Sequence, residues 1–442
     1  MISEARRTRL ISTACVITTA LLLLCIAPQT QAVPAFARQM GVPCSTCHFQ
    51  HFPLLNSFGR IFKASGFTMA GTPLTESDGF SLPVNLNAAI FTNLRFQKSN
   101  GTKNPAEHTS NNGEFILPGE TSLFVGGRVS PNVGALIEGD VGAGGINGGG
   151  FLASIKLPMF FDVTDNVSAG IVPFSAGLGP SYAFEMLNTG AVGNHIINLV
   201  HPTAISAQQY VQVGTNSNTE GDAEGVALVA VSSDFFVTGA LWSPNHSVVD
   251  SSGTSASPKS DYFRAAVTPQ IGSWDVGMGV QLYDGRSNVV TGPGAWTRYS
   301  TRAWAVDGQL QGGIASMHDM PVGVYVSYAQ APASTASEPN LYNAGSETKK
   351  SASVAAEFGL FKQGRGTVQL AYRWGRSGDP QYSNDNAATA GLTYLPWDNV
   401  QFAMYETWFS GNAHSDAASG LGAIDASGSG KSLLSLNMAV GF

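Results

Sequence analysis

A residue-by-residue alternation of apolar with small or polar side chains is the feature that most constrains the fold of this chain. In 321–331, Val322, Val324 and Val326 alternate with a glycine, a tyrosine and a serine. Successive residues of a β-strand point to opposite faces, so this pattern predicts a strand with one apolar face and one small or polar face. The same alternation recurs in 274–286 and 367–377. It predicts a protein that is mostly β.

The composition favours a membrane-spanning version of such a fold. Only 12% of the residues are charged and 51 of the 442 are glycine, whereas soluble proteins carry about 25% charged residues. No run of about 20 apolar residues occurs after residue 32, which excludes membrane-spanning helices. Low charge, many glycines and alternating strands are typical of transmembrane β-barrels. The net charge of -7 argues against nucleic acid as a partner.

Sixteen strands follow from counting these segments and placing the turns. Bacterial outer-membrane barrels have an even number of strands, short periplasmic turns and longer outer loops. Leaving out a further candidate, 205–215, puts the short turns on one side, the long connections on the other and both termini in the periplasm. The predicted strands are 84–97, 115–129, 133–142, 151–163, 167–176, 223–232, 235–243, 261–271, 274–286, 298–314, 321–331, 350–360, 367–377, 386–396, 399–410 and 432–442.

The last of these strands supports the same fold. Leu434, Leu436, Met438 and Val440 share one face, which ends with Phe442. A final strand that ends in an aromatic residue resembles the assembly signal of outer-membrane proteins. We therefore predict a 16-stranded antiparallel transmembrane β-barrel, surrounded by lipid in the outer membrane of a Gram-negative bacterium.

Residues 1–32 are predicted to be a secretory signal peptide. Arg6, Arg7 and Arg9 precede a nearly continuous apolar stretch at 10–27, and a small-x-small cleavage site follows at 30–32. This arrangement directs export and is removed from the mature protein. A retained membrane anchor is the alternative, although the apolar stretch is short for that role. After cleavage, Cys44 and Cys47 are the remaining cysteines.

Cys44, Cys47 and His48 form a C-x-x-C-H sequence in this exported chain. Two thiols at this spacing can bond the two vinyl groups of one haem, and the adjacent histidine then lies under the iron as proximal ligand. A zinc site needs further cysteine or histidine ligands, a thioredoxin-type site needs a βαβ context, and a disulfide is a third alternative. The motif predicts one covalently attached haem c.

The ligand on the opposite side of the iron is less determined. Met69 offers a thioether of the kind found in Met/His haems, although a role in apolar packing suits it equally. His51 is too close in sequence to His48 to reach the opposite face. Further candidates are Met40, His195 and His201.

Positive side chains near the motif are candidates to bind the haem propionates. Arg38, Arg60 and Lys63 can each form charge-assisted hydrogen bonds with a carboxylate. Their alternative role is that of ordinary solvent-facing charges, which suits Lys63 at least as well.

This part of the chain resembles the N-terminal module of the fused monohaem cytochrome–porins of iron-oxidising bacteria. The resemblance rests on the segments 34–39, 44–48, 52–54, 58–60, 62–63 and 66–67. Phe67 stands where that family more often has tyrosine, and His51 lengthens the stretch between the haem histidine and the Phe-Pro pair. The resemblance implies electron transfer from an extracellular donor such as Fe(II) to a soluble periplasmic cytochrome. Composition alone gives no indication of iron.

Three parts of the chain are expected: a signal peptide at 1–32, a small helical monohaem cytochrome c module at 33–80 and the porin-like barrel at 81–442. So short a module cannot bury a haem by itself, and a 16-stranded barrel has room for it. We therefore expect the module in or at the mouth of the barrel. The long connection 177–222 either folds into the lumen, which we favour slightly, or forms a surface lobe.

The predicted function is electron transfer across the outer membrane from an extracellular donor to a periplasmic cytochrome. Neither a G-x-S-x-G nor an H-E-x-x-H motif occurs, so the sequence offers no hydrolase nucleophile or metalloprotease site. Two alternatives stay open. One is a solute-selective porin with a structural or sensory haem, and the other is a small haem enzyme with an open iron site.

Overall fold

The structure is a computed structural model that describes residues 34–77, 80–100, 112–141, 152–190, 206–212, 222–244, 258–292, 295–317, 319–360, 365–414 and 431–442. All of these residues belong to one compact unit, Gln31–Phe442. The predicted signal peptide lies outside the described residues, as do His195 and His201. Among the described residues, no helix is long and apolar enough to cross a membrane.

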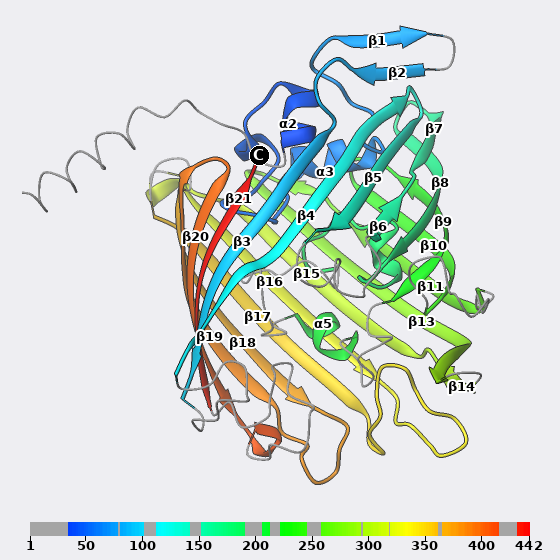
Figure 1. Ribbon diagram of the computed structural model, residues 1–442, viewed down its shortest axis with the longest axis vertical. Coiled ribbons are helices and arrows are strands. Elements are labelled where there is room, and N and C mark those ends of the chain that lie inside the picture. Colours follow the sequence, from blue (N-terminus) through cyan, green and yellow to red (C-terminus); the bar gives the residue numbers. More distant parts are fainter. Residues whose placement is uncertain are drawn as a thin grey trace, which may run out of the picture. The chain divides into compact units, whose positions relative to one another are not determined.

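Antiparallel strands close into a single barrel, as predicted (Figure 1). Three of its sixteen strands are each drawn in two pieces, and β21 pairs with β3 to complete the ring. The barrel strands are β3 (Ala88–Ser99), β4 (Glu114–Ser130), β5 (Val133–Asp140), β6 (Leu152–Lys156) with β7 (Met159–Thr164), β8 (Val167–Ala176), β9 (Ala223–Val231), β10 (Phe235–Ser243), β11 (Ser260–Val267) with β12 (Gln270–Ile271), β13 (Trp274–Gly292), β14 (Ala295–Ser300) with β15 (Ala303–Ile314), β16 (Met320–Ala331), β17 (Lys349–Gly359), β18 (Gly366–Arg376), β19 (Asn386–Trp397), β20 (Val400–Ser410) and β21 (Ser432–Gly441).

The predicted strand positions are confirmed to within a few residues, and β8 and β10 match them at both ends. The largest difference is the hairpin of β13 and β14, which continues beyond the predicted ends at 286 and 298. The uncertain candidate 205–215 contains the short helix α5 (Ala207–Gln212) in place of a strand. Leaving it out of the strand count was therefore correct.

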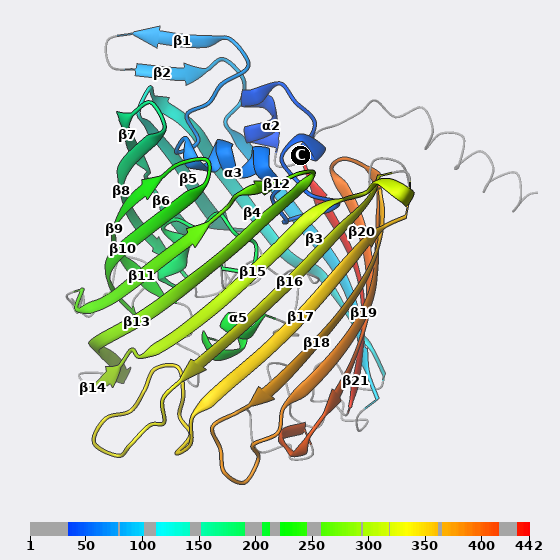
Figure 2. The same ribbon diagram turned by 180° about the vertical axis from the view of Figure 1, so that it is seen from behind.

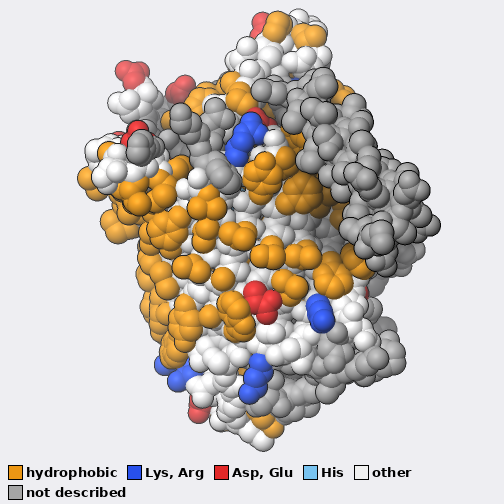
Figure 3. Space-filling model, turned by 90° about the vertical axis from the view of Figure 1, so that its left-hand side faces the viewer, with side chains coloured by type: hydrophobic (Ala, Val, Ile, Leu, Met, Phe, Trp, Pro, Cys, Tyr) orange, Lys and Arg blue, Asp and Glu red, His pale blue; other side chains and the backbone are white. Residues whose placement is uncertain are grey.

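Alternation along the strands separates an apolar outer face from a polar inner face. In β16, Val326 is exposed on the outside, whereas Tyr325 and Ser327 are buried on the inside. Hydrophobic side chains predominate on the face of the barrel wall seen in Figure 3. The outward apolar residues include Val125, Phe161, Leu228, Leu241, Met278, Leu282, Val306, Val354, Leu370, Leu392, Met404 and Leu436.

We call the described residues up to Pro83 the N-terminal module. It contains α2 (Pro34–Met40), the 3-10 turn η1 (Cys44–Thr46), α3 (Ser57–Ala64) and a hairpin of β1 (Leu74–Ser77) with β2 (Phe80–Pro83). The predicted boundary at residue 80 falls inside this hairpin, which the sequence reading did not anticipate. The helices lie at the end of the barrel where the chain terminus is marked (Figures 1 and 2).

The described parts of the long connection, 177–190 and 206–212, lie in the barrel lumen, and we call them the lumen insert. Phe184, Met186 and Leu187 are buried in a hydrophobic cluster with inward residues such as Phe236 and Tyr262. The backbone N–H of Ala207, at the start of α5, donates to Ser327 Oγ at 2.8 Å. The slightly favoured inward path of this connection is therefore confirmed for its described residues.

Candidate functional site

The C-x-x-C-H segment adopts a tight turn that brings its three functional side chains to one cavity. Cys44 starts η1, and its carbonyl oxygen accepts from the N–H groups of Cys47 at 3.0 Å and His48 at 2.9 Å. Short i→i+3 and i→i+4 bonds of this kind fold the two thiols and the imidazole into one local unit. Burial raises the pKa of the Cys47 thiol.

Asn56 connects this turn to helix α3. Its side-chain oxygen accepts from Gly59 N at 3.0 Å, which makes it the N-cap of α3. Its side-chain nitrogen donates to Thr46 O at 3.0 Å, and its own N–H donates to Cys47 O at 3.0 Å. One residue thus fixes the start of the helix against the cysteine turn.

His48 is held as a neutral imidazole with one nitrogen left for a ligand bond. Nδ1 lies 3.1 Å from the carbonyl oxygen of Leu54, so Nδ1 carries the proton and donates. Because burial removes water from the ring, the pKa of His48 falls to about 4. A backbone carbonyl that accepts from Nδ1, with Nε2 unprotonated, is the usual arrangement of a metal-binding histidine.

A cavity of about 240 Å³ contains all three motif residues. Its walls are mostly apolar, and they come from the N-terminal module and from three adjacent barrel strands. Phe124 of β4, Leu136 of β5 and Lys156 of β6 form the barrel side. The module side consists of Phe36, Ala37, Val42, Pro43, Cys44, Cys47, His48, Leu55, Gly59, Phe62, Lys63 and Phe67.

The module is bound to the inner barrel wall on several sides. His51 Nε2 lies 2.7 Å from a Glu357 carboxylate oxygen of β17, and Arg60 forms an ion pair with Asp275 of β13. The Phe52 N–H donates to Gln401 Oε1 of β20 at 3.0 Å. Because these contacts reach strands far apart around the ring, the module fills this end of the barrel.

Leu54 shows how deeply the module enters the barrel. Its side chain is 0% exposed and packs with inward residues of three strands, Tyr325, Ala355 and Tyr405. The structure therefore places the module inside the barrel end, as its small size predicted.

Arg38 and Arg60 do not line the cavity, contrary to the role in propionate binding predicted for them. Arg38 donates to the carbonyl oxygens of Leu86 and Ala88 at the start of β3. Arg60 is 3% exposed and is directed to Asp275. Both guanidinium groups attach the module to the barrel. Of the three predicted cations, Lys63 alone lies at the cavity.

The methionines considered as distal ligands also lie away from it. Neither Met69 nor Met40 is among the residues that line the cavity. The backbone carbonyl of Met69 accepts from Gln39 Nε2 at 2.5 Å, which fixes this segment against α2. The described part of the cavity offers only Lys63 and Lys156 as nitrogen donors besides His48.

A residue of the lumen insert supports the histidine loop from the opposite side. The Asn188 amide accepts from Leu55 N at 2.8 Å and donates to Leu55 O at 3.0 Å. Its own N–H donates to Gln309 Oε1 of β15 at 2.8 Å. Leu55, the residue after the Leu54 carbonyl, is therefore held by the lumen insert, which is itself hydrogen-bonded to the barrel wall.

Sequence reasoning missed Lys156, Asn188, Phe124 and Leu136, because they are distant from the motif in sequence. One signal was readable for Lys156, which is a charged residue in a predicted strand with apolar neighbours. Its inward direction depends on strand register, since Lys156 pairs with Leu136 across β5 and β6. No local pattern marks Asn188, which lies in a turn of the lumen insert.

The lumen itself is packed. Inward polar side chains around the ring are nearly fully buried, and Arg264 illustrates this at 0% exposed. It is paired with Asp307 of β15 and with Glu185 of the lumen insert. Other inward residues buried to a similar degree are Thr238, Gln281, Gln309, Glu357, Gln369, Arg373, Thr389 and Thr407.

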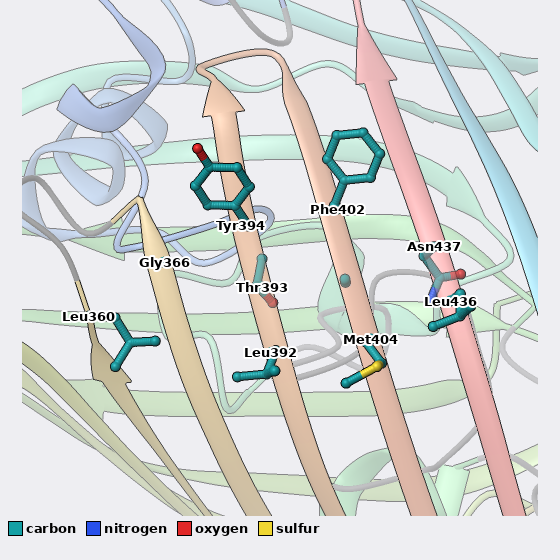
Figure 4. Close-up of a pocket in the computed structure, with 10 residues that line it drawn as sticks. Leu360, Gly366, Leu392, Thr393, Tyr394, Phe402, Met404, Leu436 and Asn437 are labelled. Carbon is teal, nitrogen blue, oxygen red and sulfur yellow. The ribbon is translucent and has the colours of Figure 1, made fainter. Parts of the chain in front are cut away.

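A second hollow, of about 700 Å³, lies on the barrel wall between β18 and β21 (Figure 4). Its outward side chains, Leu392, Tyr394, Phe402, Met404 and Leu436, are each 40% exposed or more. They belong to the apolar outer face described above. The described residues of this hollow include no charged group, and we assign no chemistry to it.

No protein-family model matches the chain, and no curated protein matches it. Several solved structures resemble it. OprB of Pseudomonas putida is 10% identical over 80% of this chain and 93% of that chain, with a TM-score of 0.49. In-vitro folded OmpT, an outer membrane protein of Vibrio cholerae, is 10% identical over 84% of this chain and 100% of that chain, with a TM-score of 0.46. A mutant porin of Rh. blastica is 10% identical over 80% of this chain and 99% of that chain, with a TM-score of 0.43. At such identities the likeness concerns the fold alone.

Proposed function

We propose that this protein is an outer-membrane c-type cytochrome–porin that carries electrons from an extracellular donor to a periplasmic cytochrome. One observation carries the proposal: Cys44, Cys47 and His48 line a single apolar cavity whose other wall is the inside of a barrel. A redox group at that place has the barrel as its insulation from the membrane.

The chemistry of the residues at the cavity supports one covalently attached haem. Cys44 and Cys47 supply the two thiols, and His48 supplies an unprotonated Nε2 held by the Leu54 carbonyl. A bound haem would supply a one-electron redox couple whose potential depends on the axial ligands, the surrounding polarity and hydrogen bonding. The zinc alternative finds no support among the described residues, where no group of three or more cysteine, histidine or acidic side chains has metal-binding geometry.

The chain's own residues keep this site dry and fixed. Phe36, Phe62 and Phe67 form an aromatic group on the module side, with ring centroids 5.0 to 5.9 Å apart. Phe124 and Leu136 close the barrel side. An apolar, water-poor surrounding disfavours net charge on a redox centre, which tunes its potential.

The location in the outer membrane follows from the barrel. A closed ring of strands leaves no unpaired edge, and its outward side chains are apolar, which are the two requirements for a β-structure in lipid. The proposal also includes an export signal at 1–32 and a periplasmic position for both termini. The cavity then faces the periplasmic side, where an electron-accepting cytochrome would dock.

The donor and acceptor are proposed from the resemblance of 34–67 to the fused cytochrome–porins. That family resemblance implies Fe(II) outside the cell and a soluble cytochrome in the periplasm. The described connections 332–348 and 377–385 lie at the end of the barrel opposite the module (Figure 1), where an extracellular donor would approach. The solute-selective porin is less well supported, because the inward side chains are buried where a water-filled channel would expose them.

A small haem enzyme is the second candidate, and one observation favours it. Among its described residues, the cavity contains no methionine and no second histidine that could bind the iron of a haem in addition to His48. An open position would bind an external ligand such as carbon monoxide without displacing a protein group. Prompt spectral change of the reduced protein with carbon monoxide would favour the enzyme.

The test of haem attachment compares the purified full-length protein with the double variant Cys44→Ala/Cys47→Ala. We expect the mass of one covalent haem and a c-type spectrum in the first, and neither in the second. Ser45→Ala, between the two cysteines, is the matched control and should keep the haem. Covalent haem in the double variant would contradict the proposal.

The electron-transfer step is tested by mixing the oxidised protein with Fe(II) without oxygen. Reduced c-type bands should appear, and addition of an oxidised soluble c-type cytochrome should reverse them. A haem that stays oxidised in excess Fe(II) would exclude this donor. It would leave the attachment site intact.

A further inference from the structure

Two lysines reach the candidate haem cavity from opposite sides. Lys63 belongs to α3 of the module, and Lys156 is the last residue of β6 on the barrel wall. Both line the cavity that contains Cys44 and His48. The cavity thus combines apolar walls with two positive charges.

Lys156 is enclosed by aromatic rings and is only 4% exposed. Its ammonium group donates to the Tyr182 carbonyl at 3.0 Å. It also lies 4.1 Å from the ring centroid of Tyr182 and 5.7 Å from that of Phe67. Tyr182 and Phe67 orient the group as neutral partners. The Glu138 carboxylate of β5 also attracts it, without forming an ion pair.

Neither lysine takes part in any ion pair between described residues, all of which involve other cations. Burial lowers the pKa of Lys63, although the carboxylate of Glu185 acts in the opposite direction. Buried charges are costly unless they are paired. Two ammonium groups beside one apolar cavity therefore call for a ligand with two negative groups.

We propose that Lys63 and Lys156 bind the two propionate carboxylates of the haem. This inference rests on the haem attachment proposed above and adds a residue of the barrel wall to the cofactor site. It replaces Arg38 and Arg60, whose guanidinium groups are directed elsewhere.

The arrangement has a consequence for the redox couple. Ferric haem carries one more positive charge than ferrous haem, so nearby cations favour the reduced form. One unit charge at a distance of about 12 Å contributes on the order of 1.4 kcal/mol at an effective dielectric constant near 20. That energy corresponds to about tenfold in the equilibrium constant, or roughly 59 mV for one electron.

The experiment measures the midpoint potential of the purified full-length protein by optical redox titration. Lys156→Gln and Lys63→Gln should each lower the potential by roughly 59 mV, about tenfold in the equilibrium constant. Their visible spectra should stay unchanged, because the iron ligands are unaffected. Lys156→Arg keeps the charge and should restore most of the potential.

Lys350→Gln is the matched control. It changes a lysine of the barrel strand β17 that lies over the Trp374 ring, away from the cavity residues. Its potential should equal that of the unaltered protein. If Lys156→Gln does not assemble as a barrel, Lys63→Gln decides the question, and an unchanged potential in that variant overturns the inference.

Covalent haem with an unchanged potential in both Gln variants would overturn the inference and leave the proposed function standing. A changed axial-ligand spectrum in either variant would also overturn it, because that lysine would then be an iron ligand. Absence of covalent haem from the unaltered protein would instead overturn the proposed function.

Discussion

At the scale of single residues, the cysteine turn depends on how closely helix α3 approaches it. A Cβ atom on Gly59 would overlap the backbone carbonyl oxygen of Cys47, and it would also touch the Leu55 side chain. Backbone cannot yield as a flexible side chain can. One added carbon at Gly59 would thus push helix α3 away from the C-x-x-C-H turn.

Gly59→Ala should therefore reduce haem attachment while the barrel still forms. Overpacking of this kind costs about 1–3 kcal/mol, which is enough to open the contact between α3 and the turn. The haem content per barrel, measured by absorbance and mass spectrometry, should fall. Gly239→Ala is the control, since a Cβ there meets no atom within 4 Å. Full haem content in Gly59→Ala would show that the close contact is dispensable.

The buried pair of His51 and Glu357 predicts a pH dependence of module docking. Burial opposes protonation of His51, but the Glu357 carboxylate outweighs it and raises the pKa of His51 above its usual 6.5. Its Nδ1 faces the Phe52 carbonyl, and Gln369 also contacts its ring. A raised folded-state pKa gives stabilisation that is complete below about pH 6.5 and is lost as the pH rises through the raised value.

Hydrogen exchange of residues 48–55, corrected for the intrinsic effect of pH, measures this dependence. The free energy of local opening should decrease as the pH rises above 6.5. Glu357→Gln should lower it by about 3–5 kcal/mol at low pH, because a buried charge loses its partner, and should flatten the profile. An equally steep profile in that variant would assign the pH effect to another group.

At the scale of elements, the strands were predictable and the site was only partly so. Period two is a local property, and it located strands such as β8 and β10 to the residue. The C-x-x-C-H motif is local as well, and the structure gathers its three side chains at one cavity. Lys156 and Asn188 reach that cavity or its supporting loop only through barrel closure and the path of the lumen insert. No short stretch of the sequence therefore predicts the position of either residue.

Barrel closure also explains why Arg38 and Arg60 do not take the role in propionate binding that the sequence predicts for them. Sequence proximity to the motif put both near a haem carboxylate. The structure instead offers them backbone carbonyls on β3 and a carboxylate on β13, which are acceptors that only the closed barrel provides. A charged group takes the acceptor that tertiary structure places nearest to it.

The hydrogen bonds of Asn188 with Leu55 predict that the lumen insert stabilises residues 48–56, which contain His48. Asn188→Ala leaves the half-buried N–H and C=O of Leu55 without these partners, which costs about 1 kcal/mol. Residues 48–56 should exchange hydrogen faster, and the spectral bands sensitive to the proximal histidine should broaden. Asn188→Asp keeps the acceptor for Leu55 N–H but loses the donor. Its exchange rates should therefore lie between those of Asn188→Ala and those of the unaltered protein.

The control is Asn132→Ala, which removes one amide hydrogen bond to Phe160 O at a turn of the barrel. It should change neither the exchange of 48–56 nor the spectrum. An Asn188→Ala protein that is identical to the unaltered one in both measurements would show that the insert merely fills space.

At the scale of the whole molecule, this barrel differs from an open channel of the same size. Barrels with 16 strands are wide enough to leave an aqueous passage. Here the N-terminal module fills one end, and the lumen insert packs along the inner wall. The buried ion pairs of Arg264 with Asp307 and Glu185 fix the insert to β11 and β15. Filling of this kind suits a protein that passes electrons and retains solutes.

The unaltered protein should therefore give no steady ionic conductance in planar lipid bilayers. Arg264→Ala removes the cation that anchors the insert and leaves two carboxylates buried, at a cost of about 3–5 kcal/mol, so intermittent openings should appear. Arg302→Ala, which removes an exposed ion pair with Asp284, should stay closed because exposed pairs contribute about 1 kcal/mol or less. Steady conductance of the unaltered protein would instead mean that solutes cross the lumen, and the porin alternative would then replace the electron conduit.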